Sequence, residues 1–384
     1  MAADVELLIV GAGPFGLALA AHAADLGLDY LIVGEPMGFW KRHMPAGMYL
    51  RSAYDWHYDP QGEATIARYF QEQGLDPDAV VPIPLESYIP YGAWFQEQKG
   101  IVPLPRLVER LDRTADGAGF RAGFADGEEV SARNVALALG FEYFAQAPEE
   151  LAALLPPGRY SHTCQTVDLE RFRGQRVLLV GGRQSAFEWA ALLVERGAAE
   201  VHLSHRHPTP PFTASDWSWT DPLLERMPRE PGWFRHLPPR EQRAVTQRMW
   251  GEGRLKLEPW LAPRLAGDAV HIWPETRVTG SREQGDGTLA VALDSGQELA
   301  LDHVILATGY KVDIGRIPLL ARGTLLPQVA THDGYPALDE RFQTSVPGLY
   351  ITSIAASRDF GPFFGFTRAV RASAMLIGRG VTGV

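Results

Sequence analysis

Cysteine is almost absent from this chain, because Cys164 is the only one among its 384 residues. A single thiol can form neither an internal disulfide nor the paired redox cysteines of a CxxC motif. A dithiol mechanism of electron transfer is therefore excluded. We interpret Cys164 as a small apolar residue rather than a reactive thiol.

Long apolar runs and an excess of positive charge are also lacking. No apolar run reaches the roughly eighteen residues of a membrane-spanning helix, and no basic segment followed by an apolar one opens the chain. The net charge of −10 argues against nucleic acid or an anionic membrane as partner. We expect a cytoplasmic protein. No HExxH or CxxC spacing and no nucleophile beside a base is present, so we predict no metal and leave the catalytic residues unknown.

The chain does contain an apolar run that ends in a glycine turn. The sequence VELLIVGAGPFG, residues 5–16, predicts a strand, a tight turn and a helix. Gly11 permits the sharp exit from the strand, Gly13 lets the backbone approach a pyrophosphate, and Gly16 lets helix and strand pack closely. The predicted cofactor-binding residues of this turn are Gly11, Gly13, Pro14, Phe15 and Gly16.

An acid follows these glycines at the distance expected of a ribose ligand. A second apolar run, residues 29–34, ends at Glu35, where a carboxylate can accept both ribose hydroxyls. A glycine turn so near the first residue is typical of chains that bind FAD with their first segment, so we predict a FAD site. The alternatives are a glycine-rich turn in another α/β protein and a solvated carboxylate.

Residues 35–60 are rich in glycine, proline, methionine and aromatic residues and show no clear period. We interpret this segment as a packed loop that lies where the flavin ring would emerge. Trp40, Met48 and Arg51 are candidate contacts to the ring. Core packing for the aromatic residues and solvation of Arg51 are the alternative.

The plan of the first half is repeated in the second. Residues 176–186 again predict a strand followed by a glycine-containing turn, and each copy continues through a β-meander to a buried strand ending in glycine. The separation of Gly11 from Gly140 nearly equals that of Gly181 from Gly309. Two copies of one nucleotide-binding plan are therefore visible.

The predicted fold class is α/β, with two Rossmann-like, three-layer ββα dinucleotide-binding domains, the second inserted in the first. We predict a FAD-binding domain at 1–157 and 303–384 and an NAD(P)H-binding domain at 158–302. A non-repeated insert, 208–267, is interpreted as a lid or substrate subdomain over the second domain, or else as a structural elaboration or oligomer contact. Helical patterns cover residues 64–73, 85–98, 187–196 and 240–250.

The second copy has Ser204-His205-Arg206 where the first has an acid. An arginine there suits the 2′-phosphate of NADPH, although a solvated arginine is the alternative. Arg183 stands where a glycine would admit the pyrophosphate, so its guanidinium either folds onto the phosphates or changes how the nucleotide binds. Three histidines at 202–207 suit a phosphate-binding strand end at least as well as a metal. The predicted ligands are Gly181, Gly182, Arg183, Gln184, Ser185 and Arg206.

Together these motifs resemble the two-dinucleotide flavin monooxygenases, which comprise N-hydroxylating, Baeyer–Villiger and microbial flavin-containing enzymes. The matching segments are GAGPFG at 11–16, QSAxE at 184–188, ATGY at 307–310 and GxxxH at 158–162. Residues 40–48 are similar to the flavin-ring loop of the N-hydroxylating branch. The resemblance covers nearly the whole chain.

The chain departs from the family pattern at three positions. Pro156 and Thr166 stand where aromatic residues are expected, which argues against a Baeyer–Villiger enzyme, and Ser353 replaces a glycine after the last strand. The resemblance implies a helix at 363–377 whose N-terminus faces the flavin's pyrimidine edge. The remaining predicted cofactor-binding residues are Thr308, Gly309, Asp359 and Phe360.

The resemblance also implies the chemistry. NADPH would reduce FAD, O2 would form a C4a-(hydro)peroxyflavin, and one oxygen atom would pass to a small-molecule substrate, with N-hydroxylation favoured. The residues do not rank amines over other substrates and leave a homo-oligomer open. The alternative function is an NAD(P)H-dependent flavin reductase or electron-transfer flavoprotein without a redox dithiol, and a weaker one is a non-catalytic flavin or nucleotide sensor.

Overall fold

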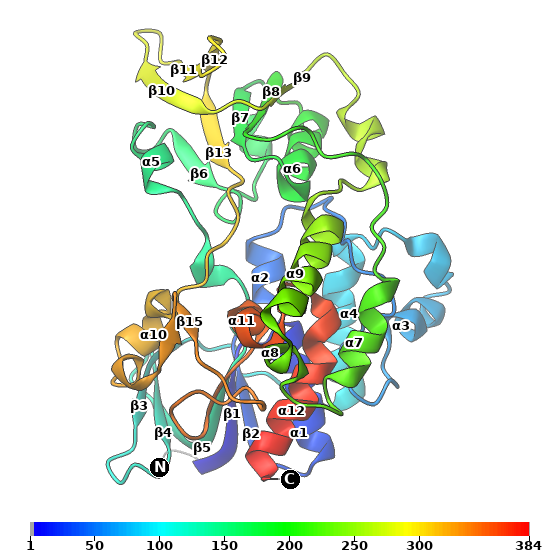
Figure 1. Cartoon of the computed structure of the whole chain (residues 1–384), viewed down its shortest axis with the longest axis vertical. Helices are drawn as coiled ribbons and strands as arrows, with labels where there is room; N and C mark the ends of the chain where they lie inside the picture. Colours follow the sequence, from blue (N-terminus) through cyan, green and yellow to red (C-terminus); the bar gives the residue numbers. More distant parts are fainter. Residues whose placement is uncertain (1–3, 384) are drawn as a thin grey trace.

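The computed structural model describes residues 4–383 and shows a mixed α/β fold built on two main sheets (Figure 1). The strands of the first sheet are β1 (Asp4–Val10), β2 (Tyr30–Val33), β3 (Val108–Arg113), β4 (Phe120–Phe124), β5 (Glu129–Leu137) and β16 (Leu349–Ile351). Their order is β2-β1-β5-β4-β3, and β16 pairs with β5 off this path.

The second sheet contains β6 (Tyr160–His162), β7 (Arg176–Val180), β8 (Glu200–His205), β9 (Val270–Pro274) and β13 (His303–Leu306). Their order is β6-β13-β7-β8-β9. In both sheets the strand before the glycine turn lies between parallel partners. Because the carboxyl ends of parallel strands meet at one edge, the turns that follow β1 and β5 lie together.

Both predicted meanders are present, but they differ in their attachment. Strands β3, β4 and β5 pair antiparallel within the first sheet. The second meander, β10 (Val278–Glu283), β11 (Leu289–Leu293) and β12 (Glu298–Leu301), is a separate three-stranded antiparallel sheet.

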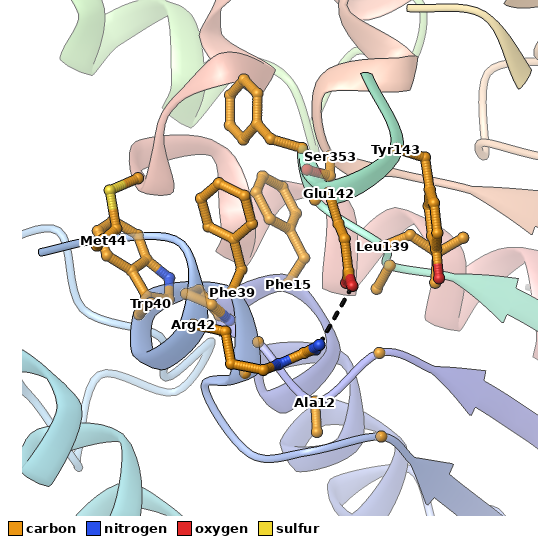
Figure 2. Close-up of a pocket in the computed structure, with 18 of the residues that line it drawn as sticks. Ala12, Phe15, Phe39, Trp40, Arg42, Met44, Leu139, Glu142, Tyr143 and Ser353 are labelled. Carbon is orange, nitrogen blue, oxygen red and sulfur yellow. Dashed lines mark hydrogen bonds and ion pairs between the residues drawn. The ribbon is translucent and has the colours of Figure 1, made fainter. Parts of the chain in front are cut away.

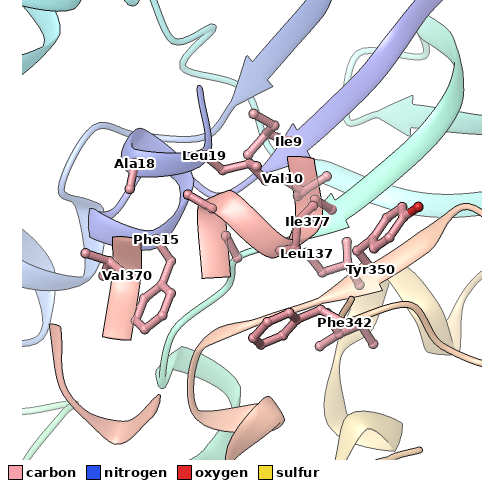
Figure 3. Close-up of a cluster of buried hydrophobic side chains, with 14 of the residues drawn as sticks. Ile9, Val10, Phe15, Ala18, Leu19, Leu137, Phe342, Tyr350, Val370 and Ile377 are labelled. Carbon is pink, nitrogen blue, oxygen red and sulfur yellow. The ribbon is translucent and has the colours of Figure 1, made fainter. Parts of the chain in front are cut away.

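The core of the first sheet lies under two helices, α1 (Pro14–Asp25) and α12 (Val370–Thr382), which pack against each other (Figure 3). Ile9 of β1, Leu137 of β5 and Ile377 of α12 are fully buried there. Burying each such side chain contributes about 1.5–3 kcal/mol. Helix α1 is apolar on nearly every face because it lies between the sheet and α12.

The four helices predicted from hydrophobic periodicity are confirmed as α3, α4, α6 and α9. The remaining helices are short, apart from α1 and α12. The bounds are α2 (Gly38–Arg42), α3 (Ile66–Glu72), α4 (Leu85–Lys99), α5 (Glu149–Ala152), α6 (Gln184–Glu195), α7 (Asp221–Arg226), α8 (Trp233–His236), α9 (Pro239–Arg254), α10 (Pro318–Ala321) and α11 (Ser357–Phe360).

The single helix predicted over 363–377 is wrong in its first part. Residues 362–365 and 367–369 form separate 3-10 turns, and α12 begins only at Val370. Phe366 between the turns has extended backbone angles (φ −137°, ψ 155°), which interrupt helical hydrogen bonding. No continuous helix therefore starts at residue 363.

The insert packs differently from the prediction that it covers the second sheet. Trp233 and Met249 of α8 and α9 belong to the core of the first sheet, whereas Leu257 and Leu261 belong to that of the second. In Figure 1 the green helices α7, α8 and α9 lie beside the red α12. The insert therefore bridges the two halves of the molecule.

The second sheet extends beyond residue 303, where the second FAD-binding segment is predicted to begin. Strand β13 pairs in parallel with β6 and β7, so the second sheet extends to Leu306. No helix among residues 4–383 is long and apolar enough to cross a membrane.

Candidate functional site

The turn after β1 has glycines for two different reasons. A Cβ at Gly11 (φ +112°) would lie 2.4 Å from the carbonyl oxygen of Ala138, and a Cβ at Gly16 would lie 1.8 Å from that of Gly11. A Cβ at Gly13 would meet no atom within 4 Å. Close packing therefore requires two of these glycines, and the third leaves open space at the N-terminus of α1, where anionic groups bind favourably.

A cavity of about 710 Å³ begins at this turn. Its walls come from the first glycine turn, loop 34–52, residues 138–143 after β5, helix α6, the end of α9 and residues 365–367. Figure 2 shows Ala12 and Phe15 of the turn, with Trp40 and Met44 on one side and Leu139 and Tyr143 on the other. The volume lies within the range of cofactor and ligand sites, which is about 300–1,000 Å³.

The structure brings most of the first predicted group of residues to this cavity. Gly16 is not in the wall because it packs against the strand. The predicted residues that line the cavity are Gly11, Gly13, Pro14, Phe15, Glu35, Trp40, Met48 and Arg51.

Glu35 stands at the cavity wall as an ion-paired carboxylate. Its Oε2 is 3.0 Å from Nε of Arg42, whose Nη1 donates to Oε1 of Glu142 at 3.4 Å (Figure 2). Sequence reasoning missed both partners, although Arg42 lies inside residues 35–60, the segment predicted to lie where the flavin ring emerges, which we call the flavin-ring loop. The three side chains place one positive charge between two negative ones at the predicted ribose position.

Arg51 is neither solvated nor free. Its Nε donates to Oε1 of Glu258 at 2.7 Å, and its Nη1 donates to the carbonyl of Gly253 at 2.6 Å. Both side chains of the pair are only 12% and 13% exposed. Arg51 therefore ties the flavin-ring loop to the insert across the cavity.

The second predicted group is split. Gln184 and Ser185 line the same cavity, whereas the other four residues do not. Gly181 repeats the geometry of Gly11, because a Cβ there would lie 2.4 Å from the carbonyl oxygen of Ala307. Gly182 is covered by His205 and His207, whose ring atoms would lie 2.5 and 2.7 Å from its Cβ. Arg183 is partly buried and Arg206 is exposed.

The four residues predicted from the C-terminal motifs are not brought to the cavity wall. The hydroxyl of Thr308 donates to the carbonyl of Gln146, and Nε2 of His162 lies 3.1 Å from the carbonyl oxygen of Gly309. Asp359 accepts from the N–H of Leu338 at 2.8 Å and pairs with Arg235 at 3.1 Å. Phe360 stacks on Phe342 with centroids 3.6 Å apart. None of these four residues is in the cavity wall.

Ser353 does line the cavity. Its backbone is left-handed, with φ +66°, a conformation that favours glycine. The sequence signal was present, because the resemblance expects glycine at this position. Serine therefore keeps the backbone conformation of the residue it replaces.

Glu188 of α6 was not predicted as a site residue, although it belongs to the QSAxE motif. It is fully buried, lines the cavity and accepts the N–H of Tyr49 at 2.8 Å through Oε1. Its Oε2 has no hydrogen-bond partner among residues 4–383. Burial raises the pKa of this carboxyl to about 8, so it holds a proton at neutral pH.

Arg254, at the end of α9, also lines the cavity and was missed because the non-repeated insert gave no motif. No hydrogen bond or ion pair of its guanidinium occurs within the described part of the chain. Burial, reinforced by the charges of Arg51 and Arg183, lowers the pKa of Arg254 to about 10. An unneutralised cation in such a place is suited to an anionic ligand.

The histidines of β8 do not converge on one point. His202 stacks on His271 with centroids 4.7 Å apart, whereas His205 packs against His207 at 4.9 Å. Ligand atoms of Glu200, His202 and His271 lie within 4.8 Å of one another. However, the indole N–H of Trp273 donates to Nδ1 of His202 at 3.1 Å, which leaves the proton on Nε2, the atom facing Glu200. This arrangement suits a hydrogen-bonded cluster better than a metal site.

No family model matches the chain. It is 27% identical over 359 residues to a ferredoxin–NADP reductase of Thermus thermophilus, covering 91% of this chain and 84% of the relative. It is 26% identical over 336 residues to the indole-3-pyruvate monooxygenase YUCCA8 of Oryza sativa, covering 80% and 76%.

Two solved structures match over almost the whole chain. The ornithine N-hydroxylase of Kutzneria sp. 744 aligns with a TM-score of 0.78 and 14% identity, covering 97% of this chain and 98% of the other. The L-lysine 6-monooxygenase of Pseudomonas syringae aligns with a TM-score of 0.75 and 22% identity, covering 99% of both chains. The chain therefore has the fold of the two-dinucleotide flavin monooxygenases, the group that its motifs resemble.

Proposed function

We propose that this protein is a FAD-containing, NADPH-dependent monooxygenase that oxygenates a small molecule, with N-hydroxylation favoured. One observation carries the proposal: a single cavity runs from the first glycine turn, past α6 of the second sheet, to the insert. A flavin, a nicotinamide and a substrate would therefore share one cavity. The likeness in fold to the ornithine and lysine hydroxylases supports this assignment.

The residues present fit FAD. The open space at Gly13 adjoins the N-terminus of α1, and Glu35 follows β2 at the ribose position. We assign FAD to residues 1–157 and the C-terminal part, and NADPH to the inserted domain that contains the second sheet. Because β13 pairs with β7, we propose that the inserted domain ends after Leu306 rather than at residue 302.

When bound, FAD supplies the redox chemistry, by accepting hydride from NADPH and reducing O2. The chain's own residues orient the reactants and exclude water. The ion pair of Arg51 with Glu258 holds the insert against the flavin-ring loop. Glu188 carries a buried proton at the cavity wall, and Arg254 offers a positive charge there.

The test uses purified full-length protein loaded with FAD. NADPH should bleach the flavin without oxygen, and readmitted O2 should restore its colour. A panel of primary amines, including ornithine, lysine and cadaverine, together with sulfides and ketones, is then screened for oxygenated product by mass spectrometry. With one of these compounds, the amount of oxygenated product formed should nearly equal the amount of NADPH consumed. A colourless protein, or one whose flavin accepts no electrons from NADPH, would contradict the proposal.

A second candidate is an NAD(P)H-dependent electron-transfer flavoprotein. The identity with a ferredoxin–NADP reductase over 91% of this chain favours it. The same preparation distinguishes the two functions. An electron-transfer protein would reduce added ferredoxin at the expense of NADPH and give no oxygenated product from the panel.

A further inference from the structure

The two glycine turns have similar backbone angles at the start of the helix, but Arg183 stands in the second turn where Gly13 stands in the first. Gly13 and Arg183 are both the N-cap residues of the following helices, with similar extended angles (φ −88°, ψ −172° and φ −116°, ψ 177°). A Cβ at Gly11 or at Gly181 would lie 2.4 Å from the carbonyl oxygen of the residue that follows the neighbouring strand, Ala138 after β5 or Ala307 after β13. The position that is open space beside Gly13 in the first turn is therefore occupied by the side chain of Arg183 in the second turn.

That side chain reaches the insert. The guanidinium carbon of Arg183 lies 5.6 Å from the ring centroid of Trp250, on α9. Trp250 is 51% exposed, which is unusual for so large an apolar side chain. The cation–π contact between an exposed indole and a guanidinium is weak, so this guanidinium can bind a stronger partner such as an anion.

Positive charge gathers around this turn without compensation. No ion pair within residues 4–383 is formed by Arg183, Arg206 or Arg254. Burial is the main cause that lowers the pKa of Arg183, and the positive charge of Arg206 lowers it further. Gln184, the next residue, is 8% exposed and keeps its amide nitrogen without a hydrogen-bond partner in the described chain. Unpaired donors of this kind, on a helix N-terminus, indicate an anionic ligand.

We propose that the guanidinium of Arg183 binds the pyrophosphate of the second nucleotide, in place of the close backbone approach that a glycine would allow. Trp250 of the insert positions this guanidinium. This inference rests on the proposed function. It makes the insert part of the NADPH site as well as a neighbour of the flavin. It also explains why an arginine can stand where close backbone approach is lost: a bidentate fork reaches the phosphate oxygens from farther away.

The test measures NADP⁺ and NAD⁺ binding to FAD-loaded protein by isothermal titration calorimetry. Arg183→Gly should weaken both ligands by the same factor, about tenfold or more, because both carry the pyrophosphate. Arg206→Ala should weaken only NADP⁺. Arg243→Ala, which removes an exposed charge from α9, controls for long-range electrostatics and should change neither by more than about twofold.

Trp250 is tested as a positioning residue. Trp250→Ala should weaken both nucleotides about threefold, Trp250→Phe should restore binding, and Trp250→Ala should have no effect in the Arg183→Gly background. Flavin absorbance and circular dichroism of each variant report an intact fold. Unchanged or tighter binding by Arg183→Gly, or loss of NADP⁺ alone, overturns this inference while the proposed function stands. Wild-type protein that binds neither nucleotide overturns both.

Discussion

The buried carboxyl of Glu188, on the first helix of the second sheet, accepts the backbone N–H of Tyr49, in the flavin-ring loop, at 2.8 Å. The two residues belong to different halves of the molecule. This bond, with the Arg51–Glu258 pair, joins the walls of one cavity.

Glu188 should make stability fall as pH rises. Its pKa is about 8 in the folded protein against an ordinary value of 4.5, so between these pH values the unfolded chain releases a proton that the folded chain keeps. Glu188→Gln keeps the acceptor for Tyr49 but cannot ionise. Urea unfolding measures the free energy of unfolding at pH 5 and at pH 8. Between these pH values it should fall by on the order of 3 kcal/mol more for wild type than for the variant. Equal losses would show that Glu188 does not hold a proton.

Arg51→Ala should open the cavity. Removing this cation leaves Glu258 buried without its partner, which costs about 3 kcal/mol. The free energy of unfolding should fall by this order, and NADPH oxidation uncoupled from product should rise because water enters. Arg51→Ala combined with Glu258→Gln should recover part of the stability, since no unpaired charge remains. If the single variant matches wild type in both measurements, the pair does not close the cavity.

The first glycine turn offers a matched pair of variants. Gly13→Ala places its Cβ in open space, whereas Gly16→Ala places it 1.8 Å from the carbonyl oxygen of Gly11. We expect Gly13→Ala to fold, with an unchanged circular dichroism spectrum, but to bind FAD about tenfold more weakly because the methyl group occupies the phosphate space. Gly16→Ala should fail to fold. A Gly13→Ala protein with full flavin content would place the pyrophosphate elsewhere.

Arg206→Ala should affect the use of NADPH and NADH differently. Arg206 is exposed at the end of β8 and has no ion pair in the described chain. If it holds the 2′-phosphate, the KM for NADPH should rise about tenfold and the KM for NADH should stay nearly constant. Steady-state kinetics with both reductants checks this, and equal changes would remove the reason for choosing NADPH.

Residues that act through local geometry were predicted well. The glycines of the first turn, the strands around them and helices α3, α4, α6 and α9 follow from periodicity and turn chemistry, which are properties of short segments. The helix predicted from residue 363 failed because Phe366 adopts an extended backbone, which periodicity does not reveal.

Site residues outside motifs were not predictable in the same way. Arg254 lies in an insert with no internal repeat, and its place in the cavity wall depends on how α9 packs. Asp359 and Phe360 followed from the resemblance, but their partners Leu338 and Phe342 hold them away from the cavity.

The sequence by itself determined the two strand–turn–helix units and their spacing, because these depend on residues close along the chain, and it predicts a dinucleotide ligand for each turn. Only the tertiary structure decided that the insert bridges both halves, that Arg183 reaches Trp250 and that the buried Glu188 accepts the backbone N–H of Tyr49. Such contacts join side chains far apart in sequence, and their burial and charge exist only once the segments have packed.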